Sequence, residues 1–229
     1  MLKRGIALLL LLCMALPCAA TAEQADARRV VYLTFDDGPS SSNTARLLDG
    51  LKARGAHCTF FLVGQWVDKY PESVKQLSDA GMEVMNHSDD HAHFAKLSAS
   101  EIVENINACN AKIEAITGVR PTLFRCPYGE YDDNVIDTVN GMGMTAIQWD
   151  VDSLDWKDLS ADEITRRVLD GVEPGSIVLF HNAAKHTPEA LAGIIEALQA
   201  DGYTIVPISQ LLLSGEYSID HTGRMHPAA

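Results

Sequence analysis

Glycine recurs at nearly regular intervals along this chain, each time between a helical pattern and a short apolar run. Successive members of the series stand 25 to 37 residues apart, which is the length of a strand–helix unit. A glycine just past a helix supplies the left-handed conformation that turns the chain back. The series consists of Gly55, Gly81, Gly118, Gly143, Gly175 and Gly202. The spacing therefore predicts an α/β fold of repeated strand–helix units.

The apolar runs predict strands near residues 30–35, 57–63, 82–86, 122–125, 144–149, 176–180 and 203–206. The patterns between them predict helices near residues 43–54, 71–80, 99–117, 131–141, 161–172, 187–201 and 207–213. Capping boxes at Ser98–Glu101 and Ser160–Glu163, and a cap at Thr187 before Pro188, mark three helix starts. Seven such units can close into a TIM-like barrel or remain a doubly wound open sheet.

Polar residues gather just past the ends of the expected strands. In a TIM-like barrel all strand C-termini open onto one face, where catalytic groups collect. The residues in question are Asp36 and Asp37, His87 and His91, Arg125 and Tyr128, Asp150 to Asp155, and His181. We therefore expect a single-domain, distorted (β/α)7-8 TIM-like barrel with its active site at the strand C-terminal face.

The N-terminus has the layout of a secretory signal peptide. Lys3 and Arg4 precede an apolar run over residues 6–16, and the small residues of 20–22 provide a cleavage site before Glu23. An uncleaved membrane anchor is the alternative, although the apolar run is short for a membrane span. We expect a secreted or cell-envelope protein with a signal peptide at 1–22, one domain at 23–213 and a C-terminal extension at 214–229.

The net charge limits the kinds of partner the chain can bind, and the cysteine content limits its disulfides. Removing Lys3 and Arg4 takes the net charge from −13 to −15, which argues against a nucleic acid. The mature chain keeps Cys58, Cys109 and Cys126, too few for a disulfide framework and odd in number. At least one thiol is expected to stay unpaired unless it bonds another chain, and a monomer is the default expectation.

Two patterns suggest a metal site. Asp36 and Asp37 stand side by side at the end of an apolar run, and the repulsion between adjacent carboxylates is tolerable if one binds a cation and the other meets a base, or if both face water. Alone, the pair also fits a solvated turn. His87 and His91 are four positions apart and, with Asp37, supply two nitrogens and one oxygen, the pattern of an open catalytic zinc site. The alternative is a pair of surface histidines in an acidic loop.

Other polar and aromatic residues follow later strands. Arg125 could orient a carboxylate by paired hydrogen bonds, or simply lie at the surface before a proline turn. His181 could act as a general acid, or merely cap a strand. The acids between Trp149 and Trp156 could hold the second nitrogen of that imidazole. The two tryptophans are by default core or rim residues, with sugar stacking as a second use.

The motifs TFDDGP, HSDDH, RCPYG, DSLDW and LFH, in this order, resemble those of the polysaccharide deacetylases, the NodB-homology domain of carbohydrate esterase family four. The resemblance covers residues 30 to 212. It implies an N-deacetylase that hydrolyses acetamide groups of an amino-sugar polymer. It also implies a divalent metal cofactor, which we expect to be zinc, with cobalt or another divalent ion as the alternative.

Carried over by position, the resemblance implies a role for each of ten residues. Asp37, His87 and His91 would bind the metal; Asp36 would be the general base, oriented by Arg125; His181 would be the general acid, tuned by Asp155; and the backbone N–H of Tyr128 would stabilise the oxyanion. Leu179 and Trp156, with Tyr128, would contact the substrate and its acetyl group.

Three functions remain in view from the sequence. The expected one is N-deacetylation of peptidoglycan N-acetylglucosamine or chitin oligomers, with N-acetylmuramic acid left open. An O-acetyl esterase acting on a xylan-like polysaccharide would use the same residues. A non-catalytic glycan-binding module is the third, and it would bind its ligand unmodified.

Overall fold

The computed structural model describes residues 29–38, 40–210, 217–219 and 225–227. The expected signal peptide and its cleavage site lie outside the described residues. Within the described ranges, no helix has both the length and the apolar character needed to cross a membrane.

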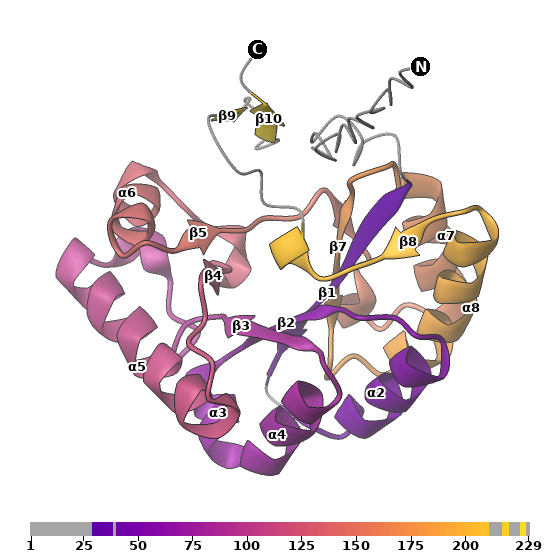
Figure 1. The fold of residues 1–229 in the computed structure, drawn as a ribbon, viewed down its shortest axis with the longest axis horizontal. Helices are drawn as coiled ribbons and strands as arrows, with labels where there is room; N and C mark the ends of the chain where they lie inside the picture. The colour runs from indigo at the N-terminus through magenta and orange to yellow at the C-terminus, as the bar shows by residue number, and fades with distance from the viewer. Residues whose placement is uncertain (1–28, 39, 211–216, 220–224, 228–229) are drawn as a thin grey trace, which may run out of the picture.

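Eight parallel strands make one curved sheet (Figure 1). They are β1 (Val30–Asp37), β2 (Thr59–Leu62), β3 (Glu83–Asn86), β4 (Leu123–Phe124), β5 (Thr145–Ala146), β6 (Val151–Asp152), β7 (Ile177–His181) and β8 (Thr204–Ile205). Seven follow the order β5-β4-β3-β2-β1-β7-β6, and β8 pairs with the first two residues of β1. In the described part of the chain no ladder joins β5 to β6, so the sheet curls into a half-barrel. The predicted α/β fold with a distorted barrel is confirmed, without full closure.

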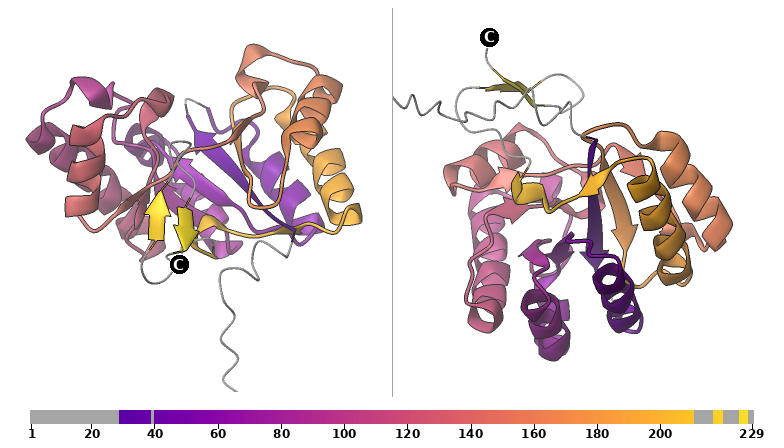
Figure 2. Two further views of the ribbon diagram at one scale, coloured as in Figure 1. Left: turned by 90° about the horizontal axis from the view of Figure 1, so that it is seen from above. Right: turned by 45° about the vertical axis from the view of Figure 1, so that its right-hand side comes forward.

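Helices cover the outer side of this sheet, as the two views of Figure 2 show. They are α2 (Thr44–Ala53), α3 (Gly64–Lys69), α4 (Pro71–Asp79), α5 (Ala99–Thr117), α6 (Asp133–Gly141), α7 (Ala161–Gly171) and α8 (Thr187–Ala200). The capping boxes of α5 and α7, at Ser98 and Ser160, are both formed. Gly118 ends α5 with φ +72°, the left-handed turn expected of that glycine.

The strand predicted at 144–149 is wrong in its second half. Only Thr145–Ala146 pair, with β4, and the chain then crosses to the opposite edge of the sheet, where Val151–Asp152 pair with β7. No glycine or proline separates the two strands, so the sequence shows one apolar run where the fold has an edge-to-edge crossing. This crossing carries Gln148 and Trp149 past the open side of the half-barrel.

Three further differences are local. The short helix α3 follows β2 directly and was not predicted. In the range predicted as a helix at 207–213, the described residues form only a 3₁₀ turn, Ile208–Gln210. The tail, expected only as a C-terminal extension, contains the antiparallel strands β9 (Tyr217–Ile219) and β10 (Met225–Pro227).

The alternation of side chains along β1 separates the core from the site. Leu33 and Phe35 face the main apolar core under the helices, where the ring of Phe35 stacks on those of Phe60 and Phe180 at 4.7 and 5.4 Å. Tyr32 belongs instead to a smaller cluster on the other side of the sheet. Because successive residues of a strand point to opposite faces, Asp36 shares the side of Tyr32. Cys58, Cys109 and Cys126 are all buried and free, whereas the odd count predicted only that at least one would be unpaired.

Candidate active site

A buried ion pair lies at the C-terminal end of β1. Arg125, which follows β4 directly, is fully buried and donates from Nη1 to Asp36 Oδ1 at 2.9 Å and to Thr34 Oγ1 at 2.8 Å. Its guanidinium lies 4.2 Å from the ring centroid of Phe61. Burial alone would raise the pKa of Asp36, but its electrostatic interactions with His87 and with the buried guanidinium of Arg125 outweigh it and hold that pKa below its usual value. Asp36 is therefore kept ionised in a dry environment.

The imidazole of His181, at the end of β7, is held by Asp155. His181 Nδ1 lies 2.8 Å from Asp155 Oδ1, while Asp155 Oδ2 accepts from the backbone N–H of His181 at 2.8 Å and from Thr187 Oγ1 at 2.6 Å. Burial opposes protonation, but the hydrogen bond and charge of Asp155 prevail and raise the pKa of His181. With Nδ1 engaged, Nε2 is the nitrogen left to exchange a proton with a substrate.

Thr187 has a different role in the structure from the helix cap that the sequence predicts. It was predicted to cap α8, yet His186 stands at the cap position and the Thr187 hydroxyl supports Asp155 instead. A threonine before Pro188 gives no signal for such a contact, because the partner is 32 residues away in the sequence.

His87 and His91 come together in the loop after β3. Their ring centroids are 5.0 Å apart, and His91 has φ +59°. His87 Nδ1 contacts the carbonyl oxygen of Arg125 at 2.8 Å, which leaves Nε2 with a free lone pair. Burial lowers the pKa of His87, and burial with the charge of His87 lowers that of His91 to about 4. Both rings are thus neutral at neutral pH, the form that binds metals.

Asp37 is a buried carboxylate without a partner. It is 1 % exposed, and neither Oδ1 nor Oδ2 accepts a hydrogen bond among the described residues. Burial and the neighbouring Asp36 raise the pKa of Asp37 well above its usual value. A buried carboxyl group without a hydrogen-bond partner fits a divalent cation, whose charge would satisfy it.

The structure does not bring the three expected metal ligands, Asp37, His87 and His91, together around one point. Among the described residues, no three His, Cys, Asp or Glu side chains converge closely enough to hold an ion as they stand. His87 Nε2 lies instead 3.5 Å from Asp36 Oδ2. The donor set fits a metal in its chemistry, and the ligand assignment stays a prediction.

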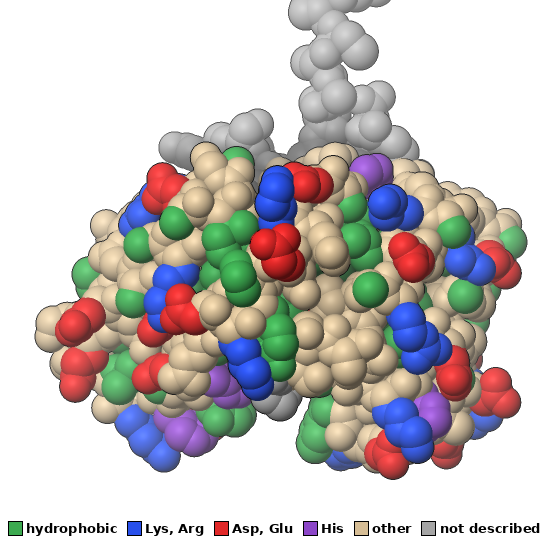
Figure 3. All heavy atoms as spheres, turned by 90° about the horizontal axis from the view of Figure 1, so that it is seen from below, with side chains coloured by type: hydrophobic (Ala, Val, Ile, Leu, Met, Phe, Trp, Pro, Cys, Tyr) green, Lys and Arg blue, Asp and Glu red, His purple; other side chains and the backbone are tan. Residues whose placement is uncertain are grey.

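The expected substrate contacts lie around the same end of the sheet. Tyr128 has φ +60°, and its backbone N–H meets no acceptor among the described residues. Its exposed ring stacks on His93 at 4.4 Å and meets His91 edge-on at 4.5 Å. Trp156, directly after Asp155, is 57 % exposed, whereas Leu179 is buried in β7 two residues before His181. Seen from below, the surface has a notch between two lobes at its lower edge, with histidine side chains on both sides of the notch (Figure 3).

The crossing between β5 and β6 supplies contacts that sequence reasoning missed. Arg125 Nη2 donates to the carbonyl oxygen of Gln148 at 3.4 Å, and Gln148 Nε2 donates to that of Gly129 at 3.1 Å. The guanidinium of Arg125 also lies 5.5 Å from the ring of Trp149. The crossing thus packs against both Arg125 and the turn at Gly129.

The sequence pattern described as "Polysaccharide deacetylase" matches residues 23–147, more than half of the chain. The chain belongs to the polysaccharide deacetylase family. It is 40% identical over 184 residues to peptidoglycan-N-acetylmuramic acid deacetylase PdaC of Bacillus subtilis, covering 80% of this chain and 39% of that protein. It is 34% identical to a chitooligosaccharide deacetylase of a Bradyrhizobium species, covering 80% of this chain and 90% of that one. The chain thus spans about two fifths of the length of PdaC.

Solved structures of the family share the fold. A peptidoglycan N-acetylglucosamine deacetylase, in complex with 4-naphthalen-1-yl-N-oxidanyl-benzamide, superposes with a TM-score of 0.79 at 33% identity, covering 81% of this chain and 89% of that one. A pseudoenzyme of the family from Bacillus anthracis superposes with a TM-score of 0.78 at 34% identity, covering 81% of this chain and 66% of that one. Membership of the family therefore does not by itself establish activity. Activity depends on which catalytic side chains this polysaccharide deacetylase has.

Proposed function

We propose that this polysaccharide deacetylase is a metal-dependent hydrolase that removes N-acetyl groups from amino sugars of an extracellular polysaccharide and releases acetate. One observation supports this most. A carboxylate kept ionised, Asp36, and an imidazole biased toward its protonated form, His181, stand on neighbouring strands with their pKa values pushed in opposite directions. A pair of titratable groups tuned apart in this way is the usual arrangement of a general base and a general acid.

Asp36 has the features of the base. Arg125 holds one of its oxygens, so the carboxylate cannot rotate freely, and the other oxygen remains available to take a proton from the attacking water. Because Arg125 is fully buried, the ion pair is shielded from solvent screening. The carboxylate is therefore oriented and charged before substrate arrives.

His181 has the features of the acid. An amide nitrogen leaves poorly as an anion, so deacetylation needs a proton on that nitrogen as the bond to the carbonyl carbon breaks. Asp155 holds Nδ1 and stabilises the imidazolium, which directs Nε2 toward the reacting group. The unpartnered N–H of Tyr128 is available to donate to the oxyanion that forms on the carbonyl.

The ligands we propose for the metal are Asp37, His87 and His91. A divalent ion there would supply Lewis-acid polarisation of the carbonyl and lower the pKa of water, each of which aids hydrolysis near neutral pH. Two imidazoles and one carboxylate suit zinc best, with cobalt or another divalent ion as the alternative. The unpartnered oxygens of Asp37 support this assignment.

The substrate class rests on the relatives. PdaC is named for N-acetylmuramic acid of peptidoglycan, and the Bradyrhizobium relative for chitooligosaccharides. Both are N-acetylated amino sugars, so an N-acetyl hexosamine in a β-linked glycan is the shared chemistry that we propose for this chain. Exposed Trp156 and buried Leu179 are proposed to contact the acetyl group and its sugar. The signal-like N-terminus supports export to the cell envelope or the medium, where such polymers occur.

The test is the identity of the product. The zinc-loaded protein is incubated separately with peptidoglycan fragments, chito-oligosaccharides and acetylated xylan, and mass spectrometry follows the loss of acetyl groups and the appearance of acetate. Deacetylation of an amino sugar in either of the first two supports the proposal. Acetate from xylan alone would make the protein an O-acetyl esterase, and binding without any product would make it a glycan-binding module.

A further inference from the structure

The loop that carries His87 and His91 is held in an unusual backbone conformation. Ser88 and His91 both have positive φ angles, +72° and +59°. Such angles cost residues other than glycine about 1–2 kcal/mol each, so contacts outside the loop have to maintain them. Within the loop, the N–H of His91 donates to Ser88 Oγ at 2.9 Å, and the N–H of Ser88 donates to Asn86 Oδ1 at the end of β3 at 2.7 Å.

Helix α5 anchors the middle of this loop through Asn105. The backbone N–H of Asp89 donates to Asn105 Oδ1 at 2.6 Å, and Asn105 Nδ2 donates to Asp90 Oδ1 at 2.8 Å. One amide side chain therefore binds the two residues that lie at the centre of the segment between the histidines. Its donor and acceptor are both used, which fixes the orientation of the amide as well as that of the loop.

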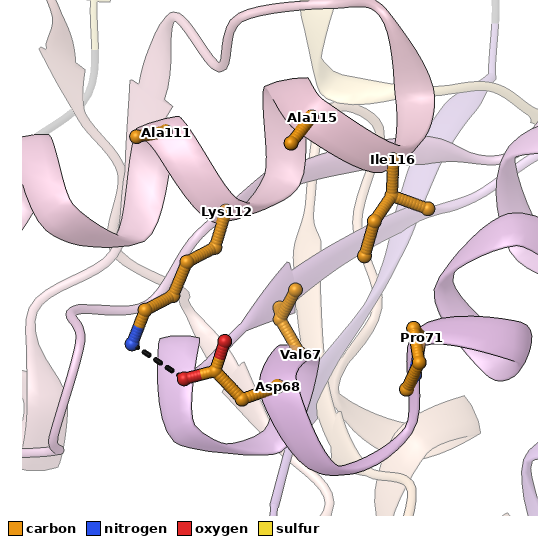
Figure 4. Close-up of a pocket in the computed structure, with 7 residues that line it drawn as sticks. All are labelled: Val67, Asp68, Pro71, Ala111, Lys112, Ala115 and Ile116. Carbon is orange, nitrogen blue, oxygen red and sulfur yellow. Dashed lines mark ion pairs between the residues drawn. The ribbon is translucent and has the colours of Figure 1, made fainter.

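Lys112 anchors the same loop from two turns further along α5. Residues seven positions apart lie on one face of a helix, so Lys112 and Asn105 face the loop together. Lys112 Nζ lies 2.7 Å from Asp89 Oδ1 and 2.7 Å from Asp68 Oδ2 of α3. Figure 4 shows Lys112 reaching across the groove between α5 and α3 to Asp68. This ammonium thus joins the loop to both helices.

Helix α3 completes the anchorage from the opposite side. The N–H groups of Gly64 and Gln65 donate to the carbonyl oxygens of Ser88 and Asp89 at 2.9 and 2.8 Å. A side chain on Gly64 would overlap the carboxylate of Asp89, so only glycine permits this approach. The loop is therefore bound to both α3 and α5, and it makes these contacts through residues other than the two histidines.

We propose that Asn105 and Lys112 are positioning residues: they hold the loop after β3 so that the rings of His87 and His91 stay side by side, with centroids 5.0 Å apart, and can share a divalent cation. This inference rests on the proposed function for the identity of the two ligands, and goes beyond it by naming the residues of α5 that prepare them. Neither residue contacts an imidazole; both act through Asp89 and Asp90. Removing a group that hydrogen-bonds directly to a metal ligand typically lowers metal affinity by 10- to 100-fold, and we apply this range to Asn105 and Lys112 because they fix the backbone that carries both ligands.

Asn107 provides a matched control on the same helix. It is partly buried like Asn105, and its Oδ1 accepts from Arg120 Nη2 at 2.7 Å, a contact remote from the loop. Asn105→Ala and Asn107→Ala therefore remove the same side chain from α5, and only the first touches the loop. Lys112→Met, which keeps the length of the stem and removes the charge, tests the second anchor if Asn105→Ala fails to fold.

The experiment measures the affinity of the full chain for Zn²⁺ alone, by competition with a chelating dye, and the unfolding temperature of each variant in the metal-free state. We expect Asn105→Ala to bind Zn²⁺ about 10- to 100-fold more weakly than wild type and Lys112→Met to weaken binding in the same direction. Asn107→Ala should bind as wild type. The visible absorption of the Co²⁺-loaded forms should change in Asn105→Ala, because ligand geometry changes, and stay the same in Asn107→Ala.

Each contrary result has a distinct meaning. Wild-type affinity for Zn²⁺ in folded Asn105→Ala and Lys112→Met would overturn the inference while leaving the proposed function standing. Equal weakening in Asn107→Ala would show a general effect of α5 stability and would also overturn it. Absence of Zn²⁺ binding by the wild-type chain would overturn both the inference and the proposed metal site.

Discussion

Asp36 and His181 are register partners in the parallel ladder between β1 and β7. Partners in a parallel pair lie on the same side of the sheet at the same height, so the candidate base and the candidate acid stand next to each other on the rigid part of the fold. Each is held by a residue from a loop: Arg125 binds the first and Asp155 the second. The loops thus supply orientation and the strands supply the spacing.

The role of Asp155 predicts a change in the pH dependence of activity. The pKa of His181 lies above its usual value, so its protonated form persists to higher pH and kcat/KM should fall only as pH rises through that raised pKa. In Asp155→Asn the charge that offsets the effect of burial on His181 is removed, so the pKa of His181 falls. The alkaline limb of the pH profile of kcat/KM should therefore move to lower pH. At a fixed pH above the limb, kcat/KM should drop about tenfold for each pH unit by which the limb moves. Asp158→Asn, on an exposed aspartate of the same segment, should leave the limb in place.

Asp37 predicts opposite effects with and without metal. Its pKa is raised in the folded protein, so the metal-free protein binds that proton more tightly folded than unfolded and loses stability as pH rises above the unfolded pKa. At neutral pH, metal-free Asp37→Asn should therefore be as stable as wild type or more stable. Wild type should gain about 2.7 kcal/mol at a zinc concentration 100 times its Kd, and the variant should not. Thermal unfolding with zinc and with chelator measures both; an equal gain in the variant would remove Asp37 from the ligand set.

Substitutions at two glycines with positive φ distinguish the cost of backbone strain from the cost of a steric clash. Gly118 and Gly129 have φ of +72° and +67°, but a Cβ on Gly118 meets open space, whereas one on Gly129 would lie 2.7 Å from the ring of Trp149. Gly118→Ala should cost about 1 kcal/mol for the backbone alone. Gly129→Ala should cost about 1–3 kcal/mol more, since the ring has to move. Urea unfolding of both variants compares them, and equal costs would show that the crossing segment does not pack against this turn.

Much of this fold could be predicted from local signals. Gly118 at the end of α5 and the capping boxes at Ser98 and Ser160 act within one or two turns, and they were found where the sequence indicated. The strands β4, β5 and β6 have two residues each, too few to show a period, so the crossing between β5 and β6 could not be read from the sequence. It depends on which edge of the sheet is still free, a property of the whole fold.

The candidate site divides in a similar way. Motif order pointed to Asp36 with Arg125 and to His181 with Asp155, and these pairs are in contact in the structure, although the roles assigned to them stay predictions. The support given by Thr187 could not be predicted, because it joins segments that only the folded chain brings together. A residue that positions another leaves no local pattern in the sequence.

The central claim, that Asp36 is the base and His181 the acid of an N-deacetylase, is tested most directly by one comparison of leaving groups. The zinc-loaded His181→Ala and Asp36→Asn variants are assayed on an N-acetyl amino sugar and on an aryl acetate ester, whose phenolate leaves without a proton. We expect His181→Ala to lose 10²- to 10⁴-fold on the amide and far less on the ester, and Asp36→Asn to lose activity on both, because both reactions need the proton taken from water. Equal losses of His181→Ala on amide and ester, with zinc still bound, would contradict the assignment of this histidine as the acid.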